Sequence, residues 1–128
     1  MPIEKGKSYT WPEIVAELHA EGTKPLYALH RNRKVVGFAL NRRQNPKAPD
    51  EILAGYGESR EQYADAFIRD QPVVPVFIRE AETEELWRCA GNFRLRGSTE
   101  ENSEKNKRVM PFDIPAIYKI LFLEEVQG

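Results

Sequence analysis

Short apolar runs alternate with clusters of glycine, proline and charged residues along the chain, and only two stretches repeat at helical spacing. The first predicted helix covers about 11–21. Thr10 can cap it, Pro12 suits its first turn, and Glu13 can reach back to the cap. We expect Gly22 to end this helix in a left-handed conformation.

The second predicted helix covers 59–69 and places Tyr63, Ala66 and Phe67 on one face. The other apolar runs are short and rich in residues that favour strands. They lie at 26–30, 35–40, 52–56, 73–78, 86–90, 92–96 and 117–123.

Polar segments rich in turn residues connect these runs. Residues 31–34 predict a hairpin between the first two strands, while 41–50 and 98–107 predict loops. Pro75 indicates an edge position or a bulge, and Gly91 indicates a bulge between two strands.

These elements predict an α+β protein: a small, bent, partly closed β-barrel with two short flanking helices. Strands and helices do not alternate regularly, which argues against a doubly wound parallel sheet. A chain of 128 residues suits one domain. We therefore assign 1–128 to a single domain, with the barrel core at about 24–124.

Composition excludes several classes of protein. The single cysteine, Cys89, permits neither a disulfide framework nor a cysteine-based zinc site, and we expect it in the core. No apolar run approaches the roughly 18 residues that span a bilayer, and the N-terminal residues lack the apolar centre of a signal peptide. We expect a cytoplasmic protein that does not contact a membrane.

Charge is distributed unevenly along the chain. The 19 basic and 20 acidic residues give a net charge of −1, yet 22–49 carries seven cations and no carboxylate, which leaves −8 elsewhere. Such a segment attracts polyanions through its local potential, although a solvated basic hairpin without a partner has the same pattern. The cations are Lys24, Arg31, Arg33, Lys34, Arg42, Arg43 and Lys47, with His30 among them.

The predicted loop at 41–50 combines cations with hydrogen-bonding side chains. Arg42 and Arg43 are expected to bind nucleic acid, because guanidinium groups contact phosphates and base edges. For Asn45 and Asp50 an ordinary turn function is the preferred alternative, since both residue types are common beside proline. The predicted nucleic-acid contacts are Arg31, Arg33, Lys34, Asn41, Arg42, Arg43, Asn45 and Lys47.

Aromatic residues on the strands have two interpretations. Four of them are expected to pack in the core: Phe38, Phe77, Phe93 and Phe122. For Tyr56 and Trp87 the choice stays open between core packing and base stacking, which needs a ring beside cations.

No pattern typical of an enzyme or a cofactor site is present. His19 and His30 lack a metal-ligand spacing, no serine lies in a nucleophile elbow, and no glycine-rich loop could cradle a phosphate. We expect no metal and no cofactor. A small hydrolase that pairs Asp50 or Glu51 with His30 is the least favoured hypothesis.

The order of four segments along the chain is similar to that in a known group of proteins. These segments lie at 48–57, 60–67, 74–79 and 87–95. They are a strand with a glycine turn, a helix, a "VPVF" strand, and an aromatic-x-x-x-Gly-x-aromatic-x-aliphatic strand. This order resembles the SRA-like modules found with some bacterial HNH restriction endonucleases, within the wider PUA-like group of small β-barrels. The resemblance covers about 26–123.

The resemblance implies a pseudo-barrel that reads nucleic acid, often a modified base in DNA, without catalysing a reaction. A reader of this kind takes the base out of its stack and holds it between rings. By position in the motifs, Tyr56 and Trp87 become candidate stacking residues, and Asp50 becomes a candidate for reading the base edge.

The leading hypothesis is therefore a non-catalytic module that binds nucleic acid, DNA in preference to RNA, through the 31–47 face. The alternative is a protein-interaction or antitoxin-like module whose basic hairpin binds an acidic protein. Binding that weakens steeply with salt distinguishes the first hypothesis, and a protein partner that survives nuclease treatment distinguishes the second.

Overall fold

The computed structural model of the chain describes residues 3–21, 27–81, 83–108 and 117–126. The elements in this part of the chain are β1 (Ser8–Thr10), α1 (Trp11–Leu18), β2 (Ala28–Arg31), β3 (Lys34–Asn41), β4 (Glu51–Gly55), α2 (Glu58–Asp70), β5 (Val74–Arg79), β6 (Leu86–Thr99), α3 (Asn102–Asn106) and β7 (Ile117–Glu125).

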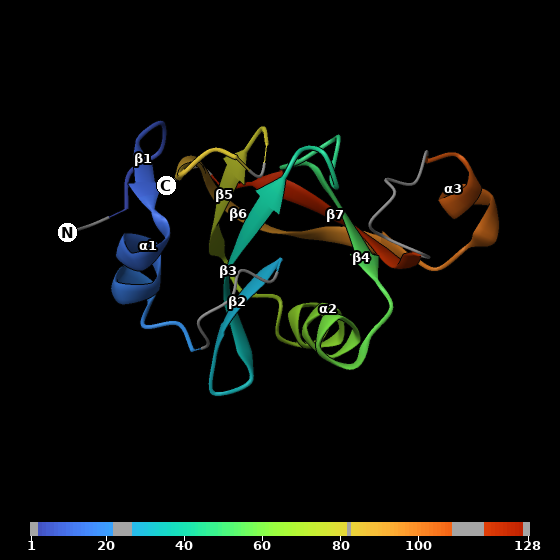
Figure 1. The fold of residues 1–128 in the computed structure, drawn as a ribbon. Coiled ribbons are helices and arrows are strands. Elements are labelled where there is room, and N and C mark those ends of the chain that lie inside the picture. Colours follow the sequence, from blue (N-terminus) through green and yellow to red (C-terminus); the bar gives the residue numbers. More distant parts are fainter. Residues whose placement is uncertain (1–2, 22–26, 82, 109–116, 127–128) are drawn as a thin grey trace.

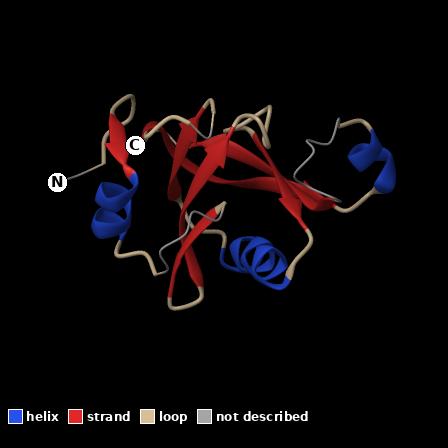
Figure 2. Ribbon diagram, viewed as in Figure 1, coloured by secondary structure: helices blue, strands red, loops and turns tan. Residues whose placement is uncertain are grey.

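Six strands form one curled sheet in the order β2-β3-β5-β6-β7-β4, and β1 pairs with β6 off this path. Neighbouring strands are antiparallel except β3 and β5, which run parallel. The sheet curls into a half-barrel (Figures 1 and 2), and its end strands β2 and β4 do not pair in the described residues. The α+β class and the bent, partly closed sheet are thus confirmed.

Helix α2 fills the concave side of the half-barrel. Its buried residues join one core cluster with the surrounding strands: Tyr63, Ala64, Ala66 and Phe67. Phe67 is fully buried, and its ring meets that of Phe38 edge to face, with 4.8 Å between centroids. Because α2 packs against β2, β3, β4, β6 and β7, this one helix connects both ends of the curled sheet.

The N-terminal residues cover one end of the convex side. There β1 pairs with β6, and α1 contributes to a second cluster that includes Phe77, Trp87 and the buried Cys89. The expected core position of Cys89 is confirmed. Gly37 leaves the space this packing needs, because a Cβ at that position would lie 3.0 Å from Leu18 Cδ1.

Several local predictions are confirmed. Thr10 and Glu13 form both hydrogen bonds of a capping box at the start of α1. Asn32 and Arg33 adopt positive φ angles of 52° and 64° in the predicted hairpin, as a two-residue turn between twisted strands requires. Gly91, with φ of 123°, lies where the register of β6 against β5 shifts, which is the predicted bulge.

The end of the first helix differs from the prediction. Helix α1 ends at Leu18, and His19 rather than Gly22 adopts the left-handed cap, with φ of 52°. The backbone N–H of His19 then bonds to carbonyls of the last helical turn, so the chain turns three residues early. Gly22 itself lies outside the described residues.

The predicted elements differ most from the structure in the second half of the chain. The predicted loop at 98–107 is wrong, because β6 continues to Thr99 and 102–106 form α3. The strands predicted at 86–90 and 92–96 are one strand, since the bulge at Gly91 bends β6 without ending its pairing. The helices also exceed the predicted two, and α2 lies inside the curve of the sheet.

Replacement of Phe67 by alanine tests how far the half-barrel depends on α2. We expect Phe67→Ala to lower the free energy of unfolding by about 3–5 kcal/mol, because it opens a cavity beneath the sheet. Leu86→Ala is the control, since that side chain is 51% exposed and should cost less than about 0.5 kcal/mol. Equal losses in urea unfolding of the two variants would contradict this account of the core.

Candidate nucleic-acid interface

The basic segment at 22–49 does not form one surface. Lys34 begins β3 and Asn41 ends it, so eight extended residues separate the hairpin turn from the loop at 41–50. A strand of that length spans about 23 Å. Figure 1 shows the turn at the lower end of β3 and the loop at its upper end. The predicted contacts therefore divide into two groups, and Lys24 lies outside the described residues.

The first group is the hairpin tip, which we define as residues 31–34. All four of its residues are exposed. The backbone N–H of Asn32 donates to Glu21 Oε1, which ties the turn to the residues after α1. Within the described ranges, Tyr56 is the one exposed residue among the tyrosines, tryptophans and phenylalanines, and it follows β4 rather than this hairpin. The tip thus presents cations without an exposed ring on the same element.

In the loop at 41–50, two asparagines predicted to contact nucleic acid accept hydrogen bonds from within the protein instead. Asn45 is 4% exposed, and its Oδ1 accepts a hydrogen bond from the backbone N–H of Leu53 at 2.8 Å. Asn41 Oδ1 accepts from Arg79 Nε at 2.7 Å. A buried polar side chain with a satisfied hydrogen bond stabilises the fold and is not free for a ligand. We therefore remove Asn45 from the predicted interface and assign Asn41 to loop support.

The cations of this loop differ in their availability. Arg42 Nη1 lies 3.0 Å from Glu80 Oε1, in an ion pair with the acidic turn after β5. Lys47 Nζ lies 3.8 Å from Glu51 Oε2, and two thirds of the Lys47 side chain is exposed. Arg43 is exposed, and it forms no ion pair with a carboxylate of the described residues. Arg43 and Lys47 are therefore the cations that the loop presents to solvent.

Trp87 does not belong to a base pocket in this structure, which corrects its predicted position. Its ring is 2% exposed and packs against Trp11, with 5.8 Å between centroids. The guanidinium of Arg79 lies 4.1 Å from the Trp87 ring centroid, so cation and ring are already paired. Asp50, in contrast, is exposed, while its backbone carbonyl accepts from the N–H of Leu123.

Tyr56 lies in a group of rings and cations contributed by β7, α3 and the end of β4. Its ring is 47% exposed and meets Tyr118 at 5.6 Å between centroids. Lys105 Nζ lies 5.9 Å from the Tyr56 centroid, and Lys119 Nζ lies 4.9 Å from the Tyr118 centroid. We call these four residues, Tyr56, Lys105, Tyr118 and Lys119, the tyrosine cluster.

Asp65 of α2 orders one side of the tyrosine cluster. The hydroxyl of Tyr118 lies 3.0 Å from both Asp65 carboxylate oxygens, and Lys119 Nζ donates to Oδ1 at 2.7 Å. The bond to Asp65 raises the pKa of Lys119. Burial, followed by the same carboxylate, raises the pKa of Tyr118. At neutral pH Lys119 is therefore charged, Tyr118 keeps its proton, and α2 fixes the position of both.

Two further cations, Lys107 and Arg108, lie in the turn after α3. Arg108 Nε donates to Glu51 Oε1 at 3.0 Å, and its Nη1 donates to the carbonyl of Glu104 at 2.8 Å. The bond to Glu51 raises the pKa of Arg108 above its ordinary value. Lys107 Nζ lies 2.9 Å from Glu104 Oε2, and hydrogen bonds from Lys107 and then Arg108 lower the pKa of Glu104. These ion pairs fasten the turn after α3 to the start of β4.

Four cations at this end of the molecule were not predicted: Lys105, Lys107, Arg108 and Lys119. Three of them fall within 105–108, a basic stretch that overlaps the end of the predicted loop. This clustering of cations in the sequence could have indicated a second basic site.

Phe122 was predicted as a core residue, but its ring is only partly buried. The guanidiniums of Arg96 and Arg108 lie 5.2 and 5.7 Å from its centroid.

Residues considered for other chemistry are engaged elsewhere. His30 stacks on Tyr63 with 4.4 Å between centroids, whereas Glu51 is bound by Arg108. His30 and Glu51, which the hydrolase hypothesis pairs, therefore each contact a different residue. No group of three potential metal ligands occurs among the described residues. In the same part of the chain, no helix has the length and apolar character needed to cross a membrane.

Comparison of the chain with known protein families, with curated proteins and with solved structures finds no match. The resemblance to SRA-like modules therefore rests on the sequence motifs alone.

Replacement of Asn45 tests its assignment to the fold. We expect Asn45→Ala to lower the free energy of unfolding by about 1–3 kcal/mol, because the N–H of Leu53 loses its buried acceptor. Asn92→Ala is the matched control, since Asn92 is exposed. An Asn45→Ala protein with unchanged urea unfolding but weakened oligonucleotide binding would return Asn45 to the interface.

Proposed function

We propose that the protein is a non-catalytic module that binds nucleic acid through the tyrosine cluster and the cations beside it. The observation that carries this proposal is the Tyr56 ring, which is 47% exposed and lies 5.6 Å from the ring of Tyr118 and 5.9 Å from the ammonium of Lys105, measured from its centroid.

Base stacking explains why such a ring would be exposed beside cations. Every nucleobase has a flat π-face, so a tyrosine ring offers contact area to any base, and neighbouring lysines attract the phosphates. Lys105 and Lys119 lie close to the two rings. Arg43 and Lys47 add exposed positive charge at the other end of β4.

This proposed interface differs from the predicted 31–47 face. It keeps Arg43 and Lys47 of that face together with the candidate stacking residue Tyr56, and it adds cations from α3 and β7. It does not include the hairpin tip, which the length of β3 separates from the loop. Asp50 remains a candidate edge reader, because its side chain is exposed at the end of the loop, directly before β4.

The finer identity that we propose is a PUA/SRA-like reader of a modified base in DNA, acting in the cytoplasm. Its support is the order of the four sequence motifs together with a curled sheet of the expected α+β kind. In this proposal the base leaves its stack and rests on Tyr56.

Substitution of Tyr56 tests the stacking contact. We expect Tyr56→Ala to weaken binding of a short single-stranded DNA by about tenfold at low salt, because one stacked base contributes about 1–3 kcal/mol. Tyr56→Phe keeps the ring and should bind within about twofold of the unaltered protein. Fluorescence anisotropy with a labelled oligonucleotide measures both variants.

Substitution of Lys105 tests the electrostatic contact. Lys105→Ala should reduce the slope of log affinity against log salt by about 0.7, the value for one phosphate contact on a single strand. Lys7→Ala removes the same charge from the residues before β1, where Lys7 pairs with Glu4, and should leave the slope unchanged. The proposal fails if no modified or unmodified oligonucleotide binds at low salt.

The separate hairpin tip favours a second candidate function, the binding of an acidic protein. Arg33 occupies a left-handed position where glycine is preferred, and there it is exposed together with Arg31 and Lys34. We expect replacement of Arg31, Arg33 and Lys34 by alanine to abolish a nuclease-resistant, stoichiometric protein complex and to leave oligonucleotide affinity within about twofold. Loss of oligonucleotide binding in this variant would instead assign the tip to the nucleic-acid interface.

A further inference from the structure

A cavity of about 270 Å³ lies at the exposed edge of β4, between the loop at 41–50 and the turn after α3. It is small for a ligand pocket, since such pockets usually measure roughly 300–1,000 Å³. Its lining residues are Pro46, Lys47, Glu51, Leu53, Lys107 and Arg108. Neither the sequence motifs nor the tyrosine cluster accounts for this cavity.

The inner part of the cavity is held rigidly. Leu53 is 6% exposed, and Asn45 binds its backbone N–H. The side chains of Glu51 and Arg108 are 15% and 13% exposed and joined by a 3.0 Å hydrogen bond. A second ion pair, 3.2 Å long, fixes Arg108 Nη1 to Glu104. The guanidinium is thus positioned before any ligand arrives.

The outer part of the cavity is positively charged. Lys47 and Lys107 line it with side chains that are 67% and 68% exposed. Lys47 Nζ lies 3.8 Å from Glu51, beyond hydrogen-bond distance, so its three N–H groups can turn to another acceptor. Three cations thus face two carboxylates, Glu51 and Glu104, both of which already accept hydrogen bonds from cations.

We propose that this cavity binds the terminal phosphate of a nucleic-acid strand, with the adjoining sugar against Pro46 and Leu53. A phosphate monoester carries about −1.5 to −2 charges at neutral pH, whereas an internal phosphodiester carries one. The terminal group therefore gains more from converging cations, and only a strand end fits a cavity this small. The proposal rests on the proposed function, because it concerns the same bound strand.

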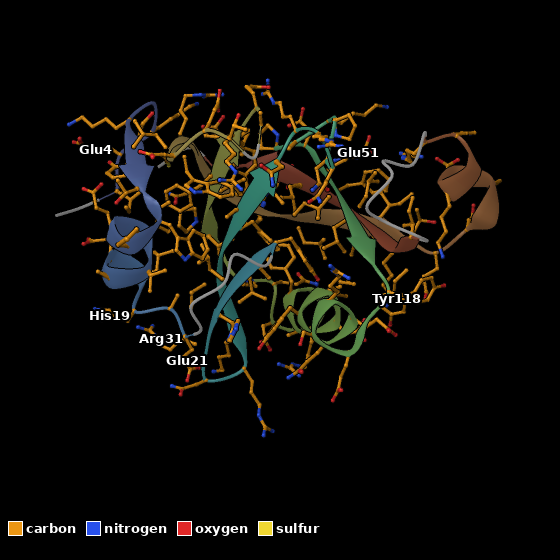
Figure 3. All side chains as sticks on the ribbon, viewed as in Figure 1. Glu4, His19, Glu21, Arg31, Glu51 and Tyr118 are labelled. Carbon is orange, nitrogen blue, oxygen red and sulfur yellow. The ribbon has the colours of Figure 1, made fainter. Side chains whose placement is uncertain are left out.

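The position of the cavity relative to the tyrosine cluster supports a shared ligand. Glu51 begins β4 and Gly55 ends it, so the strand separates the cavity from Tyr56 by about 16 Å. Figure 3 shows Glu51 at the upper end of β4 and Tyr118 beyond its lower end. A nucleic-acid strand whose terminal phosphate lies in the cavity, and which follows the edge of β4, would reach Tyr56 within a few nucleotides.

The direct test compares strand ends. A single-stranded octanucleotide of one sequence is titrated at low salt with hydroxyl groups at both ends, with a 5′-phosphate, or with a 3′-phosphate. We expect one of the phosphorylated strands to bind about five- to tenfold more tightly than the hydroxyl-ended strand, because charge-assisted hydrogen bonds add to the contact. Equal affinities for all three strands would overturn the cavity proposal and leave the proposed function intact.

Paired variants connect this preference to the cavity. Lys47→Ala combined with Lys107→Ala should remove the preference, so that the phosphorylated and hydroxyl-ended strands bind this variant with equal affinity, weakened by the loss of Lys47 from the interface. Lys5→Ala combined with Lys7→Ala removes equal charge beside β1 and should keep the preference. Circular dichroism verifies that both double variants fold. A preference that survives in the first variant would place the terminal phosphate elsewhere.

An independent titration separates failure of the cavity from failure of the proposed function. Adenosine 5′-monophosphate is the probe, and the backbone amide signals of Leu53 and Lys107 are followed by NMR. We expect saturable shifts at both amides, larger than with adenosine at the same concentration. If no oligonucleotide binds but these shifts occur, only the proposed function fails, and the cavity remains a phosphate site. Equal responses to the two probes would overturn the cavity proposal.

Discussion

A sheet that curls without closing has a concave apolar face, and this molecule depends on α2 to cover it. Phe67 and Phe38 meet at the centre of that contact, where both are fully buried. The same helix carries the exposed Asp65, two residues before Phe67 and therefore on its outer side. Because Asp65 binds Tyr118 and Lys119, the helix that completes the core also fixes one side of the tyrosine cluster.

An unclosed sheet also has two edges, and the edge at β4 is protected by polar contacts. Asn45 binds the outward N–H of Leu53, and Arg108 reaches back from α3 to Glu51. Covered and charged edges resist pairing with strands of other molecules. The same contacts bring the loop at 41–50 and the turn after α3 together, so protection of the edge creates the cavity between them.

The sequence predicts features that depend on near neighbours. The capping box of Thr10 and Glu13 and the bulge at Gly91 each need only a few residues, and the structure contains both. Trp87 shows the limit, because alternation along a strand tells which residues share a face and not which face becomes covered. The ion pair between Glu51 and Arg108 joins residues that are 57 positions apart in the sequence, and no local sequence pattern predicts such a contact.

Charge in this protein must therefore be counted in space rather than along the chain. An eight-residue strand carries the backbone about 23 Å, which separates cations that are close in sequence. Strand pairing has the opposite effect, since β4 and β7 place Tyr56 beside Tyr118. The carboxylates at this end, Asp65 among them, bind cations and thereby hold them in position. A protein with a net charge of −1 can in this way present an ordered cationic surface, because its local acids orient the cations instead of merely cancelling them.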